Sequence, residues 1–171
     1  MEIEFIKEED IVQCLNIYNY YIENTCFTLE EEKLSIEEFA KRVNRIKEKY
    51  PYIVIKENNK VLGYEYLDVF NSRSAYKITA DLSIYIDHNC IHQHLGNILL
   101  NEIEKEAKKY NIKNIVSIIT RNNIDSISFH EKHGFVLEGH LNDVANKFNK
   151  SLGIYYFRKS IWYRLVIYIF M

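Results

Sequence analysis

The fold is decided by residues 84–100, which read IYIDHNCIHQHLGNILL. The run begins with three apolar residues typical of a strand end, passes through a polar loop with one glycine, Gly96, and continues as an amphipathic helix. The first N–H groups of a helix have no partner within the helix, and the helix dipole makes that end partly positive. The stretch therefore predicts a corner that binds a phosphate or pyrophosphate group.

Apolar spacing on both sides of this corner predicts the remaining elements. Helices are expected at residues 9–24, from the capping box Ser35/Glu38 to Tyr50-Pro51, after Gly96, and at 122–132. Strands are expected at residues 3–5, 52–56, 61–66, 77–86 and 114–119, from 135 onward, and at 154–157. This order predicts a mixed α/β domain with one central sheet.

The composition limits the class of protein. With 171 residues, 47% of them apolar and 27% charged, the chain is expected to form a single domain over residues 1–171. A net charge of −2 argues against nucleic acid or a membrane surface as partner.

Three cysteines without metal-ligand spacing and an N-terminus without a signal-peptide pattern favour a cytoplasmic location. The cluster His88, Cys90, His92 and His94 lacks a second ligand pair, so no metal site is expected.

The last residues, 161–171, form an atypical apolar tail. They fall well short of the roughly 20 residues needed to span a bilayer, and Arg164 lies in their middle. We expect a final strand or an edge that faces a partner.

Six segments carry a family pattern, in order and spacing, between about residues 3 and 160: IYNYYIE (17–23), YPYIV (50–54), GYEY (63–66), RSAY (73–76), TADLSIYI (79–86) and NIDS with HEKHGF (123–135). Each alone is weak, but the ordered set is specific. It resembles the GNAT superfamily of acyl-CoA-dependent N-acetyltransferases, and within it the phosphinothricin acetyltransferase branch.

The resemblance implies a single-domain acyl-CoA N-acyltransferase fold, with a central mixed, mostly antiparallel sheet flanked by helices. It also implies acetyl-CoA as co-substrate. The pantetheine arm is expected along the strand end Ile84, Tyr85 and Ile86. The pyrophosphate is expected at the loop amides, and a further cofactor contact at Asn123; the loop residues are His92, Gln93, His94, Leu95, Gly96 and Asn97.

The loop departs from the family pattern, which has Arg or Gln, then two variable residues, Gly, one residue, and Gly or Ala. These anchor positions are here Ile91, His94 and Gly96, and only the last matches. A Cβ at His94 stands where the backbone approaches phosphate closely, although His92 or His94 can donate to a phosphate. We expect weakened CoA affinity, and an alternative interpretation is a catalytically degenerate binding module that keeps the fold.

Two residues are expected to carry the chemistry by resemblance. Asp81 matches the branch's glutamate and is the expected base, acting through a water on the protonated amine. His130 matches the branch's histidine and is the expected partner of the leaving thiolate. A solvent-facing aspartate and a packed structural histidine are the alternatives.

For the acceptor, Arg73, Tyr76 and Lys147 are the candidate binding residues, since cationic side chains suit the carboxylate of an amino-acid-like molecule. Ser151 and Gly153 replace the branch's usual Trp and Asp, so phosphinothricin is not carried over as substrate. The resemblance thus implies an N-acetyltransferase that moves an acetyl group from acetyl-CoA to a small primary amine by direct attack and that forms a homodimer.

Overall fold

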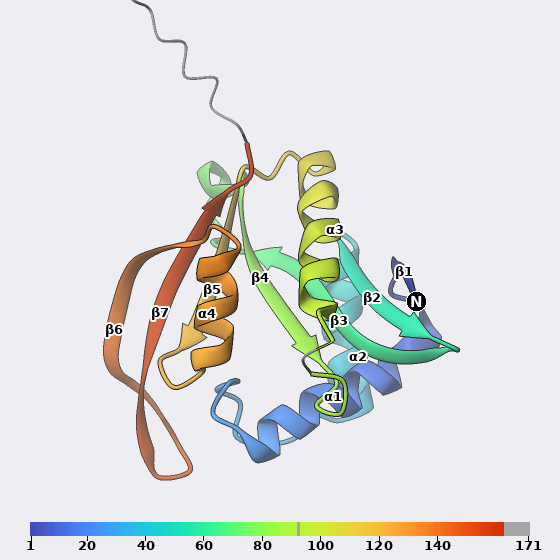
Figure 1. Ribbon diagram of the computed structural model, residues 1–171, viewed down its shortest axis with the longest axis horizontal. Coiled ribbons are helices and arrows are strands. Elements are labelled where there is room, and N and C mark those ends of the chain that lie inside the picture. The colour runs from blue at the N-terminus through green and yellow to red at the C-terminus, as the bar shows by residue number, and fades with distance from the viewer. Residues whose placement is uncertain (92, 163–171) are drawn as a thin grey trace, which may run out of the picture.

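A computed structural model describes residues 1–91 and 93–162 of the protein. Helices and strands follow one another in a mixed α/β arrangement (Figure 1), as the sequence predicts. In chain order the elements are β1 (Glu2–Phe5), η1 (Glu8–Asp10), α1 (Ile11–Asn24), α2 (Ile36–Lys47), β2 (Tyr52–Glu57), β3 (Lys60–Val69), η2 (Ser74–Tyr76), β4 (Thr79–Ile86), α3 (Leu95–Lys109), β5 (Asn114–Thr120), α4 (Ile124–Lys132), β6 (Val136–Lys147) and β7 (Lys150–Ser160), where η denotes a short 3₁₀ helix.

The strands form one seven-stranded sheet in the order β1-β2-β3-β4-β5-β7-β6. Neighbouring strands are antiparallel except β4 and β5, which are parallel. This parallel ladder contains only three residue pairs, and its last pair joins Asp81 to Val116. Beyond that pair β4 and β5 diverge (Figure 1), which leaves the end of each strand without a neighbour on the inner side.

The sheet separates two apolar cores. On one face α1 and α2 bury residues such as Ile22 and Phe39 against the tyrosine side chains of β2 and β3. On the other face α3 buries Leu99 and Ile103 against β2, β3 and β4. Each aliphatic side chain buried in this way stabilises the fold by about 1.5–3 kcal/mol. The two cores hold β4 from both sides and so fix the line along which it leaves β5.

The capping box at Ser35 forms as predicted. The Ser35 hydroxyl accepts a hydrogen bond from the Glu38 N–H at 3.2 Å, and the Glu38 carboxylate accepts from the Ser35 N–H at 2.9 Å. The helix ends at Lys47, before the expected Tyr50-Pro51. The N–H groups of Lys49 and Tyr50 both donate to Ile46, so a turn, rather than the proline, closes this helix.

Other boundaries differ slightly from expectation. The strand expected over residues 77–86 begins at Thr79, because Ser74–Tyr76 form a 3₁₀ turn that Lys77 closes by donating to the Ser74 carbonyl. Of the apolar tail, Ile161 is buried, and the Trp162 indole N–H donates to the Ile112 carbonyl at 3.0 Å. These two residues are not in a strand, and the rest of the tail lies outside the described residues.

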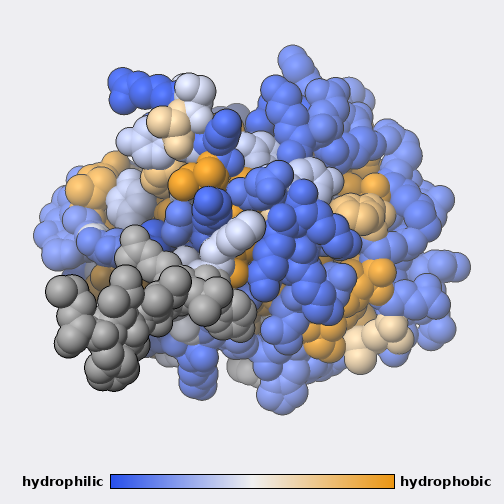
Figure 2. Space-filling view, turned by 90° about the horizontal axis from the view of Figure 1, so that it is seen from above, coloured by the Kyte–Doolittle hydropathy of each residue, from blue (hydrophilic) through white to orange (hydrophobic). Residues whose placement is uncertain are grey.

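Within the described part of the chain, none of the helices combines the length and the apolar character needed to cross a membrane. Seen from the end at which β4 begins, the surface is largely hydrophilic, with its apolar residues in separate patches (Figure 2).

Candidate active site

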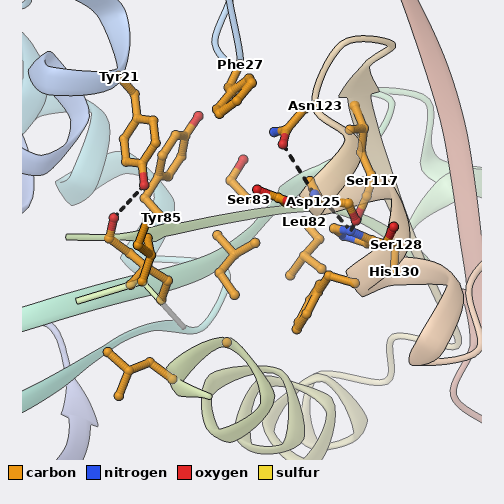
Figure 3. Close-up of a pocket in the computed structure, with 18 of the residues that line it drawn as sticks. Tyr21, Phe27, Leu82, Ser83, Tyr85, Ser117, Asn123, Asp125, Ser128 and His130 are labelled. Carbon is orange, nitrogen blue, oxygen red and sulfur yellow. Dashed lines mark hydrogen bonds between the residues drawn. The ribbon is translucent and has the colours of Figure 1, made fainter. Parts of the chain in front are cut away.

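A cleft opens where β4 and β5 diverge. It has a volume of about 790 Å³ and is bounded by both strands, the end of α1, and the beginnings of α3 and α4. Figure 3 shows Tyr21 and Tyr85 on one side of it, and Asn123, Ser117 and His130 on the other. Of the sequence-predicted cofactor residues, the structure brings these to the cleft: Ile84, Tyr85, Ile86, Gln93, His94, Leu95, Gly96, Asn97 and Asn123. His92 lies outside the described residues.

The inner edge of β4 offers free main-chain groups. The Asp87 N–H donates to the Leu62 carbonyl of β3 at 2.8 Å. Because hydrogen-bonded and non-hydrogen-bonded residues alternate in an antiparallel pair, Tyr85 bonds to β3 while Ile84 and Ile86 direct their main-chain groups toward the cleft. An extended ligand can add to such an edge as an extra strand does.

Tyr21 already binds one of these main-chain groups, the Ile86 carbonyl. Its hydroxyl donates to the Ile86 carbonyl at 2.6 Å (Figure 3), which is the direction that the alternation requires. Burial raises the pKa of Tyr21 to about 12, so the phenol keeps its proton. The groups that remain for a ligand are the two N–H groups of Ile84 and Ile86 and the Ile84 carbonyl.

The corner that the sequence predicts as an anion site lies at the start of α3. His94 is the N-cap residue and lies in the left-handed region, at φ 59° and ψ 14°, which favours glycine. The N–H groups of Leu95 and Gly96 begin the helix and have no acceptor within it. A Cβ at Gly96 would lie 3.1 Å from the Phe129 ring, so the glycine lets α4 approach this corner closely.

Asn123 is the N-cap of α4. Its side-chain oxygen accepts a hydrogen bond from the Ser126 N–H at 3.2 Å (Figure 3). The cap orients the side chain at the cleft wall, and the amide NH₂ group stays available as a donor. Asn123 thereby brings a second helix N-terminus to the cleft, opposite the first.

Asp81 lies beside the cleft on the other face of the sheet. Strand alternation places Asp81 on the α1–α2 face of β4, together with Ser83 and Tyr85. Ser83 and Tyr85 line the cleft, whereas Asp81 lies two residues before Ser83 and just outside the lining. Burial, and then the negative charge of Asp68 across the strand pair, raise the pKa of Asp81 to about 7. Arg45 donates two hydrogen bonds of 2.9 and 2.6 Å to the Asp68 carboxylate.

His130 lies on the opposite wall, on α4, and is almost fully buried at 2% exposure. Its Nδ1 lies 2.7 Å from the Ser126 carbonyl oxygen, which can only accept, so Nδ1 carries the proton. Burial lowers the pKa of His130 to about 4. The imidazole is therefore neutral, and Nε2 presents a lone pair that has no partner among the described residues.

The three predicted acceptor-binding residues are not brought together. Arg73 and Tyr76 lie before β4 begins and do not line the cleft. Lys147 lies at the far end of β6, is 1% exposed, and donates to the Thr28 carbonyl at 2.9 Å. Its side chain thus reaches the segment between α1 and α2, in which Phe27 lines the cleft (Figure 3).

Several lining residues were not identified from the sequence. Tyr21 lies within the family segment 17–23 but has no role assigned to it by the sequence, and Ser117 lies inside an apolar strand without any local motif. Spacing on α1 could have shown that Tyr18 and Tyr21 share a helix face. Nothing local marks Ser117, because its position depends on how far β4 and β5 stay paired.

A sheet that opens between two parallel strands, with a helix N-terminus at the opening, is the arrangement of the acyl-CoA N-acyltransferases. Residues 3–152 match the family model described as the acetyltransferase (GNAT) domain. The chain belongs to the GNAT acetyltransferase family, as the ordered sequence segments suggest.

Relatives with assigned activities extend over most of the chain. It is 26% identical to a phosphinothricin N-acetyltransferase of Streptomyces viridochromogenes over 86% of this chain and 80% of the relative. It is also 26% identical to an L-amino acid N-acyltransferase of Escherichia coli over 90% of each chain. Among solved structures, a GNAT superfamily phosphinothricin acetyltransferase of Sinorhizobium meliloti in complex with acetyl-CoA is 26% identical, with a TM-score of 0.89, over 93% of this chain and 87% of that one.

Replacing His94 by glycine tests the corner. His94→Gly removes the Cβ next to the amides of the first turn, so we expect CoA to bind about fivefold tighter, equivalent to about 1 kcal/mol. Isothermal titration calorimetry with CoA measures the change. Asn111→Gly is the matched control, because Asn111 has the same φ of 59° at the other end of α3 and does not line the cleft. Weaker CoA binding in His94→Gly would show instead that the imidazole holds the phosphate.

Proposed function

We propose that the protein transfers an acetyl group from acetyl-CoA to the primary amine of a small amino-acid-like molecule, by direct attack of the amine on the thioester. One observation carries the proposal: the cleft joins a free strand edge and a helix start suited to an anion, and a carboxyl group with a pKa of about 7 lies beside it. The family and the activities of the relatives support it.

The residues present fit acetyl-CoA. The N–H groups of Ile84 and Ile86 and the Ile84 carbonyl match the alternating amide groups of a pantetheine arm. The free N–H groups of Leu95 and Gly96 suit a pyrophosphate. When bound, acetyl-CoA supplies an activated acyl carbon, and these main-chain groups fix its position between the diverging strands.

Asp81 is the proposed base. An alkylammonium has a pKa of about 10, so it must lose a proton before its nitrogen can attack. A carboxyl group with a pKa of about 7 is about half ionised at neutral pH and accepts that proton readily. Because Asp81 stands one step outside the lining of the cleft, we propose that a water carries the proton from the amine to the carboxylate.

His130 is proposed to stand near the thioester. Its neutral state and its proton on Nδ1 make Nε2 a hydrogen-bond acceptor toward the cleft. In this state His130 suits the binding of an N–H or a water better than the donation of a proton to sulfur. His130 could therefore act on the thiolate, as the resemblance implies, only through another group that donates a proton to the sulfur.

Lys147 is the proposed binding residue for the carboxylate of the acceptor. Its ammonium group is buried, and among the described residues no carboxylate lies within salt-bridge distance of it. The ammonium group contacts the Thr28 carbonyl and the Phe148 ring, 5.1 Å from its centroid, and a buried cation without a carboxylate partner favours an incoming anion. Burial lowers the pKa of Lys147, and a bound carboxylate would reverse that shift. The roles of Arg73 and Tyr76 in acceptor binding stay predictions, and the proposal for Lys147 does not depend on them.

The degenerate alternative gains no support from the site. The cleft is open, and His94, the main departure from the family loop, takes the left-handed conformation of the glycine it replaces without filling the cleft. The departure affects how tightly the phosphates are held, while the strand edge and the Asp81 face are kept.

The homodimer and the cytoplasmic location stay predictions. β6 is an edge strand with exposed apolar side chains, including Val136, Leu141 and Val144, which suits pairing with a second copy. The three cysteines are buried and free, in agreement with a reducing compartment.

Replacing Asp81 tests the reaction. With acetyl-CoA and a panel of amino acids, the wild-type protein is expected to release thiol, and Asp81→Asn to lower kcat by about 10²- to 10⁴-fold. The wild-type rate rises as pH passes about 7, where Asp81 ionises; the variant keeps only the rise due to the free amine. Asp68→Asn removes the neighbouring charge and should move this inflection to lower pH. No thiol release with any amine would contradict the proposed function.

Lys147→Met tests acceptor recognition. Loss of a charge-assisted contact worth about 1.5–3 kcal/mol predicts a KM for an amino acid that is about 10- to 100-fold higher. The KM for the matching decarboxylated amine should not change. The exposed Lys150 at the start of β7 provides the control variant Lys150→Met. Equal losses for both acceptors would mean that Lys147 only fastens the hairpin to Thr28.

A further inference from the structure

Ser117 stands at the apex of the cleft. It directly follows Val116, the last residue of β5 that pairs with β4, and it lines the cleft. Ile115 and Ile119 pack in the core beneath α3, so alternation along the strand directs the Ser117 side chain to that same face. Asp81, by contrast, faces α1 and α2. The two side chains thus lie near the same apex, on opposite faces of the sheet.

The Ser117 hydroxyl has no protein partner among the described residues, although the side chain is only 2% exposed. A buried hydroxyl without a hydrogen bond costs free energy, and native proteins satisfy nearly all such groups. A hydroxyl can rotate to present its proton to a ligand. The free hydroxyl therefore points to a group that enters the cleft and accepts a hydrogen bond.

His130, on the neighbouring wall of the cleft, cannot be this donor. His130 shares this wall (Figure 3) and has its only imidazole proton on Nδ1, bound to the Ser126 carbonyl. Nε2 cannot donate, so His130 in this state cannot stabilise a negative charge. Of these two buried groups, only the serine offers a proton toward the apex.

We propose that Ser117 donates a hydrogen bond to the sulfur of the acyl donor and stabilises the departing thiolate. This inference rests on the proposed function. As the C–N bond forms, the C–S bond breaks and its electron pair goes to sulfur. Two protons leave the nitrogen, one from the ammonium before the attack and one as the C–N bond forms, and each passes through water to Asp81 and then to solvent. Ser117 keeps its own proton, and CoA leaves as a thiolate that takes a proton from solvent after release.

The two parts of the reaction, proton removal and departure of the sulfur, then take place on opposite faces of the sheet. The amine approaches from the Asp81 face, and the sulfur departs toward the Ser117 face, so the base and the thiolate donor do not compete for one position. A donor aimed at the developing charge acts mainly on kcat. Ser117→Ala is accordingly expected to lower kcat about 100-fold, while the KM for acetyl-CoA stays within about twofold.

A binding experiment tests the contact without any acceptor amine. Calorimetry at pH 9 compares CoA with desulfo-CoA, which lacks the sulfur. At this pH part of the CoA thiol is ionised, and a hydrogen bond from Ser117 favours the thiolate form. The wild-type protein is expected to bind CoA at least about tenfold tighter than desulfo-CoA, as a hydrogen bond to a charged sulfur predicts. Ser117→Ala should bind the two alike, and Ser117→Thr, which keeps the hydroxyl, should restore the preference.

Thr120→Val provides the matched control. Thr120 lies on the same strand and also has a buried hydroxyl without a partner in the described part of the chain, but it does not line the cleft. We expect this variant to keep the preference for CoA. Because the structure gives neither hydroxyl a partner within residues 1–91 and 93–162, both variants should unfold at or above the wild-type temperature. A preference that survives in Ser117→Ala, or is absent from the wild-type protein, overturns the Ser117 proposal; failure of the wild-type protein to bind either compound overturns the proposed function itself.

Discussion

The structure depends on the early end of one parallel ladder. β4 and β5 pair over three residues and then separate, although both strands continue. The helices that follow them meet in front of the opening, where Gly96 leaves room for the Phe129 ring. Unpaired main-chain groups are costly when they are buried without partners. The molecule therefore keeps a strand edge that a ligand can complete.

The opening also joins two different environments. On one face lie tyrosines, Asp81 and the segment that Lys147 fastens; on the other lie α3, α4 and the buried hydroxyl of Ser117. A thioester held between the strands would contact both. Strand alternation alone assigns Asp81 and Ser117 to opposite faces, so a simple geometric rule separates the proposed base from the proposed thiolate donor.

Much of the fold follows from local patterns. The Ser35/Glu38 capping box and the anion-binding helix start after residue 94 depend on neighbouring residues and were predicted. Lys147 and Thr28 are 119 positions apart, and no local pattern indicates that they touch. Arg73 precedes the paired part of β4 rather than its open part, and no local pattern indicates which part of the strand is paired. Long-range pairing decides such positions.

The most direct test of this account is amide hydrogen exchange of β4 with and without acetyl-CoA. In the free protein the N–H groups of Ile84 and Ile86 face the cleft, while Tyr85 bonds to β3 and serves as the internal reference. We predict that acetyl-CoA slows exchange at Ile84 and Ile86 strongly relative to Tyr85. Unchanged exchange at both residues under saturating acetyl-CoA would contradict the claim that the diverging strands bind the acyl donor.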